Sequence, residues 1–456
     1  MSDTDKMRSV NLIKNKKKKS SWVLATLLVE NYLHTHAKID QLYNASVSSI
    51  DIEKRRFCKF LFYGAIRNKL RIENAVLRCI RKSPKELLLS IFYVTGYELL
   101  TAPEEKEGAI IHHAVDQSKT LVSPKEVQFI NAVLRKLPKH FRQQEPSKSL
   151  SIYYSHPDWL VNRWIENFGR SETEALLKWN QSIPKIHLLA EPLSENLKKT
   201  IGAASYEAIN KNYQKTFKNL YTLTESSLHN PKLKALLADG KGYIKDPSTL
   251  HAVEALNPRA NESVLDLCAA PGGKSFDCLR RMGESGTVVS VDYKEKRMVR
   301  LKQNLSSFKQ GSIQLELIDC DLLTLTDQIY IERGLPTQYD AILLDAPCSN
   351  TGVIQRKPDV RWRLSPNEIK VSAELQLQLL TLASKRLKDS GRLVYSTCSI
   401  EQCENAGVIS DFLKSEAGQG FFLDLEQHFY PWIEGHDGAA VFRLIKSRSQ
   451  ENTSPI

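Results

Sequence analysis

Residues 264–277 read VLDLCAAPGGKSFD, and the C-terminal half of the chain is best understood outward from this run. An apolar segment breaks into the turn CAAPGG, and Lys274 then opens a new segment, which predicts a strand, a tight turn and a helix. Glycines let the backbone approach a ligand, and the first helical turn offers unpaired N–H groups. The spacing fits neither G-x-G-x-x-G nor G-x-x-x-x-G-K-[ST], so NAD and ATP are not the expected ligands.

A second apolar run, residues 288–291, ends in Asp292. In nucleotide-binding sheets, an acid about 20 residues after the glycine turn binds ribose hydroxyls. S-adenosylmethionine contains adenosine and a charged amino-acid end but no phosphate, so the turn and Asp292 together favour it as the cofactor. The alternative is a purely structural strand-turn-helix in a doubly wound sheet.

Composition limits the class of protein. A chain of 456 residues predicts two or three domains, and 41% hydrophobic with 25% charged residues is typical of globular proteins. No apolar run approaches the roughly 18 residues that span a bilayer, and the N-terminus lacks the apolar core of a signal peptide, so we expect a cytoplasmic protein without a membrane partner.

Eight cysteines without a C-x-x-C pair predict free thiols and no metal site. The net charge of +12 favours a polyanionic partner such as nucleic acid. Charge alone predicts affinity for nucleic acid and says nothing about chemistry on it.

The N-terminal part divides into a basic disordered arm at residues 1–20 and an all-α domain at 21–140, where apolar residues recur three and four apart. Between Lys54 and Lys82 there are ten Lys or Arg and the single acid Glu73, which predicts contact with RNA rather than an ordinary solvated helix face. The runs FYGAIR (62–67) and FINAVLRKL (129–137) resemble the RNA-binding domain of the antitermination factor NusB.

The remaining chain is predicted to form a linker with a small α/β subdomain (141–244), a Rossmann-like domain (245–447) and a tail (448–456). Apolar strands alternate with helical segments in the Rossmann-like domain, which indicates an α/β doubly wound, mostly parallel sheet with ligands at the carboxyl ends of its strands. The predicted strands are VLDLC (264–268), VVSVD (288–292), IQLELID (313–319), AILLDA (341–346) and GRLVYSTCS (391–399).

Two of these strands end beside a cysteine. Asp345 and Cys348 lie in DAPCSN, and Cys398 lies in STCS. If the two strands are neighbours, both thiols and Asp345 meet in one crevice. This combination suits methylation of pyrimidine carbon 5: one thiolate adds at carbon 6, an acid supports the charged ring, and the second cysteine assists release of the product. The attacking thiol needs a lowered pKa, because a free thiol is mostly protonated at neutral pH.

The runs DLCAAPGGKS, LLDAPCSNTGVIQRKPDVRW and LVYSTCSIEQCEN resemble the motifs of the RNA cytosine-5 methyltransferase superfamily. Together with the NusB-like front end, residues 21–447 are similar to the bacterial 16S ribosomal RNA cytosine-5 methyltransferase B family. The resemblance implies that Cys398 attacks and Cys348 helps release the product. An analogy with DNA cytosine methyltransferases, which attack from a Pro-Cys motif, would exchange these two roles.

The resemblance also implies a cofactor set and an RNA-facing set. The third cofactor acid is either Asp319 or Asp321, and we favour Asp321, where we expect the strand to end. Arg356, Lys357, Arg361 and Arg363 are expected to meet RNA phosphates. The implied binding residues for S-adenosylmethionine are Cys268, Ala269, Ala270, Pro271, Gly272, Gly273, Lys274, Asp292, Asp321 or Asp319, and Asp345, with Lys274 also among the catalytic residues.

The predicted partner is small-subunit ribosomal RNA, free or within an assembly intermediate of the ribosome. Two rival functions stay open at this point: the same chemistry on tRNA, and a non-catalytic RNA-binding or assembly factor that has kept the fold.

Overall fold

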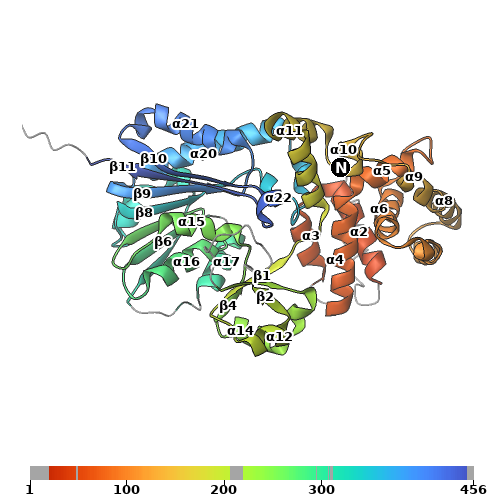
Figure 1. Cartoon of the computed structure of the whole chain (residues 1–456), viewed down its shortest axis with the longest axis horizontal. Helices are drawn as coiled ribbons and strands as arrows, with labels where there is room; N and C mark the ends of the chain where they lie inside the picture. The colour runs from red at the N-terminus through yellow and green to blue at the C-terminus, as the bar shows by residue number, and fades with distance from the viewer. Residues whose placement is uncertain are drawn as a thin grey trace, which may run out of the picture. The chain divides into compact units, whose positions relative to one another are not determined.

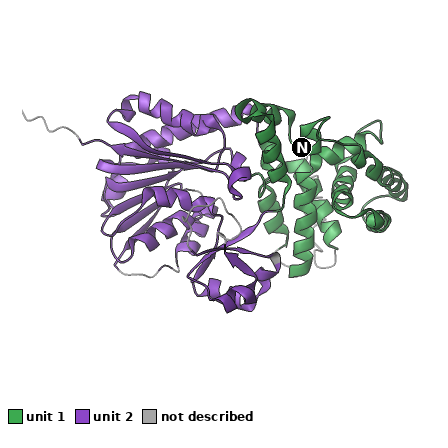
Figure 2. Ribbon diagram, in the orientation of Figure 1, with its two compact units in different colours: residues 1–183, 354–363 green, residues 184–353, 364–456 purple. Residues whose placement is uncertain are grey.

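The computed structural model describes residues 20–47, 50–205, 219–293, 295–306, 308 and 312–448. The chain forms two compact units: unit 1 comprises residues 1–183 and 354–363, and unit 2 comprises residues 184–353 and 364–456 (Figure 2). The predicted basic arm lies outside the described residues except for residue 20, and the predicted tail does so except for residue 448. Residues 150–181, expected in the small subdomain, belong to unit 1.

The described part of unit 1 is helical, as the sequence periodicity predicts (Figure 1). Its α-helices are α2 (Ser21–Thr35), α3 (Ile39–Val47), α4 (Ile52–Arg67), α5 (Lys69–Leu77), α6 (Glu86–Thr101), α7 (Glu107–Ser118), α8 (Pro124–Leu134), α9 (Leu137–Arg142), α10 (Leu150–Tyr153), α11 (Asp158–Gln181) and α19 (Val360–Arg363).

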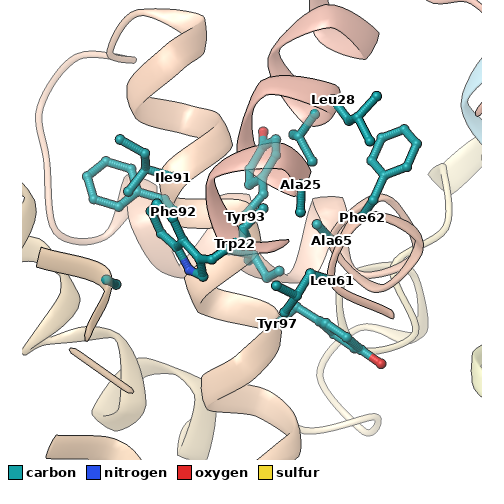
Figure 3. Packing of buried hydrophobic residues seen from close by; sticks show 14 of the residues in the cluster. Trp22, Ala25, Leu28, Leu61, Phe62, Ala65, Ile91, Phe92, Tyr93 and Tyr97 are labelled. Atoms are coloured by element: carbon teal, nitrogen blue, oxygen red, sulfur yellow. The ribbon is translucent and has the colours of Figure 1, made fainter. Parts of the chain in front are cut away.

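The core of unit 1 is built around α2, which packs against α4 and α6. Trp22, Phe62 and Phe92 are buried together there (Figure 3). Gly64 lets α4 approach α6 closely, because a Cβ at this position would lie 1.9 Å from the Tyr97 ring. The close approach explains why the resembling run FYGAIR needs a glycine at its centre.

The basic run between Lys54 and Lys82 is only partly available to RNA. The N-terminal half of α4 is mostly exposed, whereas its C-terminal half is buried. Arg67 is 6% exposed and donates to the carbonyl oxygen of Gln355 at 2.9 Å. Arg67 is therefore part of the packing of unit 1 and not of an RNA-facing surface.

The prediction that Arg361 meets RNA phosphate is wrong. Its side chain is 0% exposed, and its guanidinium donates to the carbonyl oxygens of Ser155 at 3.0 Å and Asn180 at 3.2 Å. Burial and the Arg361 charge lower the pKa of neighbouring His156, so this imidazole is neutral. Backbone carbonyl oxygens thus take the place of phosphate oxygens as acceptors for this guanidinium.

The other three residues that were expected to meet RNA phosphates, Arg356, Lys357 and Arg363, differ in exposure and in partners. Arg363 pairs with Asp359 at 2.9 Å. Lys357 is exposed and Arg356 is half-buried, so contact of these two with RNA stays a prediction.

Unit 2 begins with a small antiparallel sheet of order β2-β3-β1-β4. Its strands are β1 (Ile186–Ala190), β2 (Ala203–Ser205), β3 (Leu220–Leu223) and β4 (Gly242–Ile244), with helices α12 (Glu195–Ile201) and α14 (Pro231–Ala238). Leu188, Tyr221 and Leu233 are buried between the sheet and these helices. This layer is the small α/β subdomain that the sequence predicts, beginning at residue 186.

The larger sheet of unit 2 has the order β10-β11-β9-β8-β5-β6-β7. Strands β7, β6, β5, β8 and β9 are parallel, whereas β11 is antiparallel to both β9 and β10. The strands are β5 (Ser263–Leu267), β6 (Thr287–Asp292), β7 (Gln314–Asp319), β8 (Tyr339–Asp345), β9 (Leu387–Thr397), β10 (Phe421–Phe429) and β11 (Ala439–Lys446). The predicted doubly wound fold is confirmed, with an antiparallel edge that was not predicted.

Helices cover both faces of this sheet (Figure 1). Successive side chains of β5 point to opposite faces, so Val264 packs with α15 (Ser248–Leu256), α16 (Gly273–Met282) and α17 (Glu295–Leu305), and Leu265 packs with α20 (Pro366–Ser384) and α21 (Ala406–Lys414). The continuous apolar character of these strands follows from burial on both faces. No helix in the described ranges is long and apolar enough to cross a membrane.

Candidate active site

The glycine turn joins β5 to α16. Cys268 has φ of 60° and Gly272 has φ of 101°, so the chain reverses sharply before α16 begins at Gly273. A Cβ at Gly272 would lie 2.9 Å from Leu301, which adds a steric reason for glycine. The turn directs the start of α16, with its unpaired N–H groups, toward the carboxyl ends of the strands.

Asp292, the last residue of β6, holds this turn in place. Its carboxylate accepts from the backbone N–H of Ala270 at 2.9 Å and pairs with Arg297 at 2.8 Å. The side chain is almost fully buried. The predicted ribose acid and the predicted turn are therefore in direct contact.

Of the two expected ends of the third parallel strand, Asp319 from the run 313–319 and Asp321 from the choice of cofactor acid, the structure has Asp319. Strand β7 ends at Asp319, which lies opposite Asp292 in the parallel register. Asp321 follows the strand and accepts from the backbone N–H of Leu323 at 3.0 Å, which caps a short 3₁₀ helix. Asp319 is exposed and Asp321 is half-buried, so either carboxylate could serve as the third cofactor acid.

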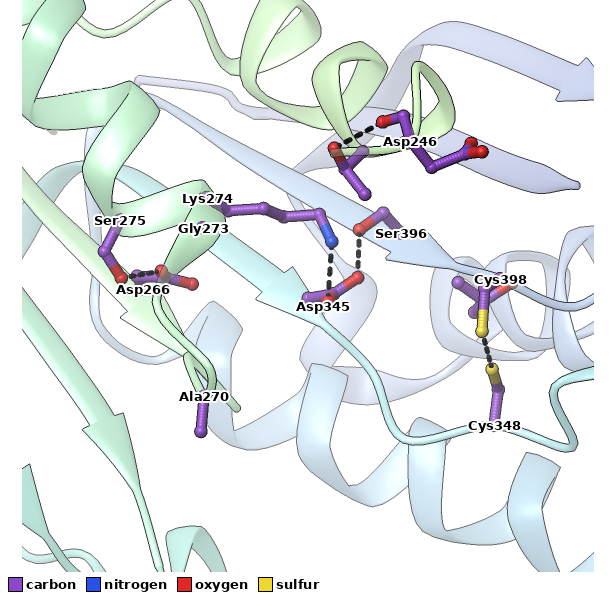
Figure 4. A network of polar contacts seen from close by, with 12 residues as sticks. Asp246, Asp266, Ala270, Gly273, Lys274, Ser275, Asp345, Cys348, Ser396 and Cys398 are labelled. Carbon is purple, nitrogen blue, oxygen red and sulfur yellow. Dashed lines mark hydrogen bonds and ion pairs between the residues drawn. The ribbon is translucent and has the colours of Figure 1, made fainter. Parts of the chain in front are cut away.

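Lys274 and Asp345 form an ion pair between the start of α16 and the end of β8, with 2.7 Å between Nζ and Oδ2. The second carboxylate oxygen accepts from the Ser396 hydroxyl at 3.0 Å (Figure 4). Burial acts to lower the pKa of Lys274, but the Asp345 carboxylate and the weaker influences of Asp266 and Cys398 together raise it. Lys274 is therefore a fixed positive charge beside the strand ends.

Cys348 and Cys398 converge, with 3.3 Å between the two Sγ atoms (Figure 4). Strands β8 and β9 are neighbours, and Asp345 lies opposite Ser396 in their register, which brings the two following loops together. The hydrogen bond to Cys398, burial and the charge of Glu404 all raise the pKa of Cys348. The structure thus brings together both predicted thiols at the ends of adjacent strands.

Asn350 and Ser396 are neighbours of this centre that sequence reasoning missed. The Asn350 carboxamide donates to the carbonyl oxygen of Cys348 at 2.7 Å, and its Oδ1 lies 3.6 Å from the Cys398 sulfur. Asn350 has φ of 63°, a backbone conformation that asparagine tolerates better than most residues. Its position two residues after Cys348 was an available signal, whereas the role of Ser396 becomes visible only with the strand register.

The residues present suit S-adenosylmethionine. Acidic side chains end β6, β7 and β8, and they would complement ribose hydroxyls and the positive sulfonium and ammonium groups. Behind the turn, the buried Asp266 accepts from Ser275 through one oxygen, while its Oδ1 has no hydrogen-bond partner among the described residues. Within the described ranges, no group of three or more His, Cys, Asp or Glu could hold a metal ion.

The remaining cysteines near the glycine turn are poor nucleophiles. Burial raises the pKa values of Cys268 and Cys278, so both stay thiols at neutral pH. Cys403 is exposed and lies in the short 3₁₀ helix Gln402–Glu404.

Comparison with protein families gives two matches, one in the N-terminal and one in the C-terminal part of the chain. The family described as 16S rRNA methyltransferase RsmB/F matches residues 253–423. The NusB family matches residues 44–139.

Curated relatives match most of the chain. The ribosomal RNA small subunit methyltransferase B of Shewanella oneidensis is 30% identical, over 85% of this chain and 90% of the relative. The protein with the same name from Serratia proteamaculans is 28% identical, over 93% of this chain and 98% of the relative.

Solved structures share the fold. The crystal structure of PH0851 matches with a TM-score of 0.72 and 21% identity, over 94% of this chain and 99% of that one. NSun6 from Pyrococcus horikoshii, solved with SFG, matches with a TM-score of 0.52 and 17% identity, over 64% of this chain and 99% of that one.

Proposed function

The chain belongs to the 16S rRNA methyltransferase RsmB/F family, and we propose that the atom it methylates is carbon 5 of a cytosine in 16S ribosomal RNA. Membership makes it an S-adenosylmethionine-dependent methyltransferase with small-subunit ribosomal RNA as its substrate class. The position of the methyl group and the covalent route are the parts that we infer from the site.

The observation that carries the proposal is the 3.3 Å contact between the sulfurs of Cys348 and Cys398, next to the Lys274–Asp345 ion pair. Methylation at an exocyclic nitrogen or a ribose oxygen needs no thiol. Carbon 5 of a cytosine does, because it is too weak a nucleophile until a thiolate has added to carbon 6. A paired thiol beside a fixed charge suits that reaction.

The first covalent step belongs to Cys398. Its thiolate attacks carbon 6, the S–C6 bond forms, and the electrons of the C5–C6 double bond make carbon 5 nucleophilic. When bound, S-adenosylmethionine supplies an electrophilic methyl group to that carbon. Lys274 stabilises the negative charge that develops on the ring, and the Asp345 carboxylate orients the base by accepting a hydrogen bond from its exocyclic amine.

The second covalent step is elimination. The proton on carbon 5 passes to solvent, its electron pair re-forms the C5–C6 double bond, and the C6–S bond breaks. Cys348 donates a hydrogen bond to the departing Cys398 sulfur, which makes that sulfur a better leaving group. Cys398 ends the cycle as a thiolate, ready for the next base.

The surroundings of the two sulfurs favour this division of roles over the reverse. Lys274 interacts electrostatically with Cys398, and its positive charge favours a thiolate there. Glu404 interacts with Cys348 and favours the thiol there. Attack from Cys348, the DNA-methyltransferase order, would place the thiolate beside a carboxylate.

The acceptor base must be unpaired or flipped out of its helix, at a cost of a few kcal/mol. We therefore infer that the substrate is free 16S ribosomal RNA or an assembly intermediate in which the base is still accessible. The exposed basic residues on the N-terminal half of α4 are suited to bind phosphates of the RNA.

The test is transfer of radiolabelled methyl groups from S-adenosylmethionine to separated 16S ribosomal RNA, 23S ribosomal RNA and tRNA, followed by digestion to nucleosides. We expect label in 5-methylcytidine from 16S RNA, and loss of one bisulfite-resistant cytosine in cells that lack the protein. Label confined to tRNA, or present as an N4-methylated or ribose-methylated nucleoside, would refute the proposal.

A further inference from the structure

Each of the two cysteines is followed directly by a serine, and both serines reach the same side chain. The hydroxyls of Ser349 and Ser399 donate to one carboxylate oxygen, Oε2 of Glu404. The two hydroxyl oxygens are themselves 3.2 Å apart. One buried acid thus connects the loop after β8 with the loop after β9, immediately behind the sulfurs.

The other oxygen of Glu404 fixes the same loops through amide donors. Oε1 accepts from the backbone N–H of Ser349 at 2.8 Å and from the Gln376 carboxamide at 3.1 Å. That carboxamide also donates to the carbonyl oxygen of Pro347 at 2.9 Å, one residue before Cys348. Backbone and carboxamide N–H groups can only donate, so Oε1 must be an acceptor in this arrangement.

Glu404 is 0% exposed and makes no ion pair with any described Lys, Arg or His side chain. Burial raises its pKa, and the hydrogen bonds from Ser349, Ser399 and Gln376 act in the opposite direction. A buried carboxylate that is matched only by neutral donors keeps much of its electrostatic influence on its surroundings. The titratable groups that interact with Cys348 include Cys398, Glu404 and Tyr395, and the backbone hydrogen bond of Asn350 acts to lower the pKa of Cys348.

We propose that Glu404 is a positioning residue of the methyl transfer: it ties both cysteine loops to one point and places a buried carboxylate against the backbone N–H that follows Cys348. This inference rests on the proposed function, because it explains how two chemically identical thiols acquire different roles. Lys274 favours the thiolate on one sulfur, and Glu404 favours the thiol on the other. The thiol form of Cys348 is the form that can donate to Cys398 during elimination.

Two substitutions of Glu404 distinguish the effect of its hydrogen bonds to the two loops from the effect of its charge. Glu404→Gln keeps the length and the Oε1 acceptor but removes the charge, and the serine hydroxyls can rotate to accept from its new amide. Glu404→Asp keeps the charge but is one methylene too short to reach both loops. We expect each to lower kcat by roughly tenfold or more, with the KM for S-adenosylmethionine within about twofold of wild type.

The readout specific to the charge is the reactivity of Cys348. In a Cys398→Ala background, the rate of Cys348 alkylation by iodoacetamide is followed against pH by peptide mass spectrometry. Adding Glu404→Gln should move the profile to lower pH, whereas adding Glu404→Asp should leave it nearly in place. In an otherwise wild-type enzyme, Glu404→Gln should also increase the fraction of covalent protein–RNA adduct, most strongly at high pH.

Asp340→Asn is the matched control. The Asp340 carboxylate also accepts from a serine hydroxyl and a serine backbone N–H, both of Ser263, at 2.7 and 2.8 Å. It lies at the opposite ends of β5 and β8 from the cysteines. Its substitution should leave the Cys348 profile and kcat unchanged.

An unaltered kcat together with an unaltered Cys348 profile in Glu404→Gln would overturn the inference. If Glu404→Gln does not fold, Ser349→Ala and Ser399→Ala each remove one hydroxyl from Oε2, and wild-type kcat in both would overturn the positioning role. The alkylation profile needs no RNA, so it tests the charge even if no 5-methylcytidine is formed. Absence of 5-methylcytidine with the wild-type protein would count against the proposed function alone.

Discussion

The run from Asp345 to Arg363 is continuous in sequence but divides into two halves that do different work. Residues 345–353 remain in unit 2 and place Cys348 beside Cys398, whereas residues 354–363 are packed into unit 1. In the first half the polar groups surround two sulfurs. In the second half the buried guanidinium of Arg361 is bound by backbone carbonyls. A motif that is contiguous in a chain can therefore combine reaction chemistry with the internal packing of a different unit.

The largest effect on methyl transfer should come from substitution of Cys398, the residue that lies beside Cys348 of the first half. Cys398→Ala removes the attacking sulfur, so methyl transfer should fall by at least about a thousandfold, equivalent to roughly 4 kcal/mol. Its thermal unfolding should match wild type, because the Cys398 side chain is small and the residue is only partly buried. Turnover near the wild-type rate would show that the paired sulfurs are not the reaction centre.

The second half should respond to mutation through stability. Arg361→Met leaves the carbonyl oxygens of Ser155 and Asn180 buried without their donor, so unit 1 should lose about 3 kcal/mol of unfolding free energy. Urea denaturation followed by circular dichroism measures the loss. The salt dependence of RNA binding should be the same in the folded variant and wild type. If RNA binding by the variant depended less steeply on salt concentration than binding by wild type, Arg361 would have to contact phosphate.

Asp345→Asn tests the role of Asp345, the first residue of the first half. The amide retains the size of the side chain but loses the ion pair with Lys274, so charge on the ring is less well stabilised. We expect kcat to fall by roughly a hundredfold, about 2.7 kcal/mol, in methyl-transfer assays at saturating S-adenosylmethionine. Lys274→Met should reproduce much of this loss, and full additivity of the two substitutions would contradict a shared role.

The smallest effect is expected at Lys357, the exposed residue of the second half. If it touches a phosphate, Lys357→Gln should weaken RNA binding by about threefold at moderate salt and reduce the salt slope by about 1. Filter-binding titrations over a range of salt concentrations measure both. An unchanged slope would leave residues 354–363 as a purely structural segment of unit 1.

Much of the site could be predicted because the sequence encodes strand ends directly. An apolar run followed by an acid or a cysteine marks the carboxyl end of a buried strand, and in a parallel sheet these ends share one edge. That reasoning predicted that Cys348 and Cys398 converge if their strands are neighbours, and β8 and β9 are neighbours in the sheet.

Other features could not be predicted because they depend on tertiary partners. Arginine is a residue type that is usually exposed. The burial of Arg361 is explained only by its carbonyl partners, which come from segments far away in the sequence. Strand β10 was missed because it lies at the edge of the sheet with no fully buried residue, so it lacks the continuous apolar run of the central strands. Glu404 is one acid among several near Cys398, and its role requires knowledge of the fold of both loops.

The most direct test of the paired sulfurs uses two variants, Cys348→Ala and Cys398→Ala. Each is incubated with 16S ribosomal RNA and S-adenosylmethionine and run on a denaturing gel. Cys348→Ala should accumulate a covalent protein–RNA band, because attack by Cys398 proceeds while elimination is slowed, and Cys398→Ala should show no such band. A band with Cys398→Ala and none with Cys348→Ala would contradict the assigned roles. No band with either variant would contradict the covalent route itself.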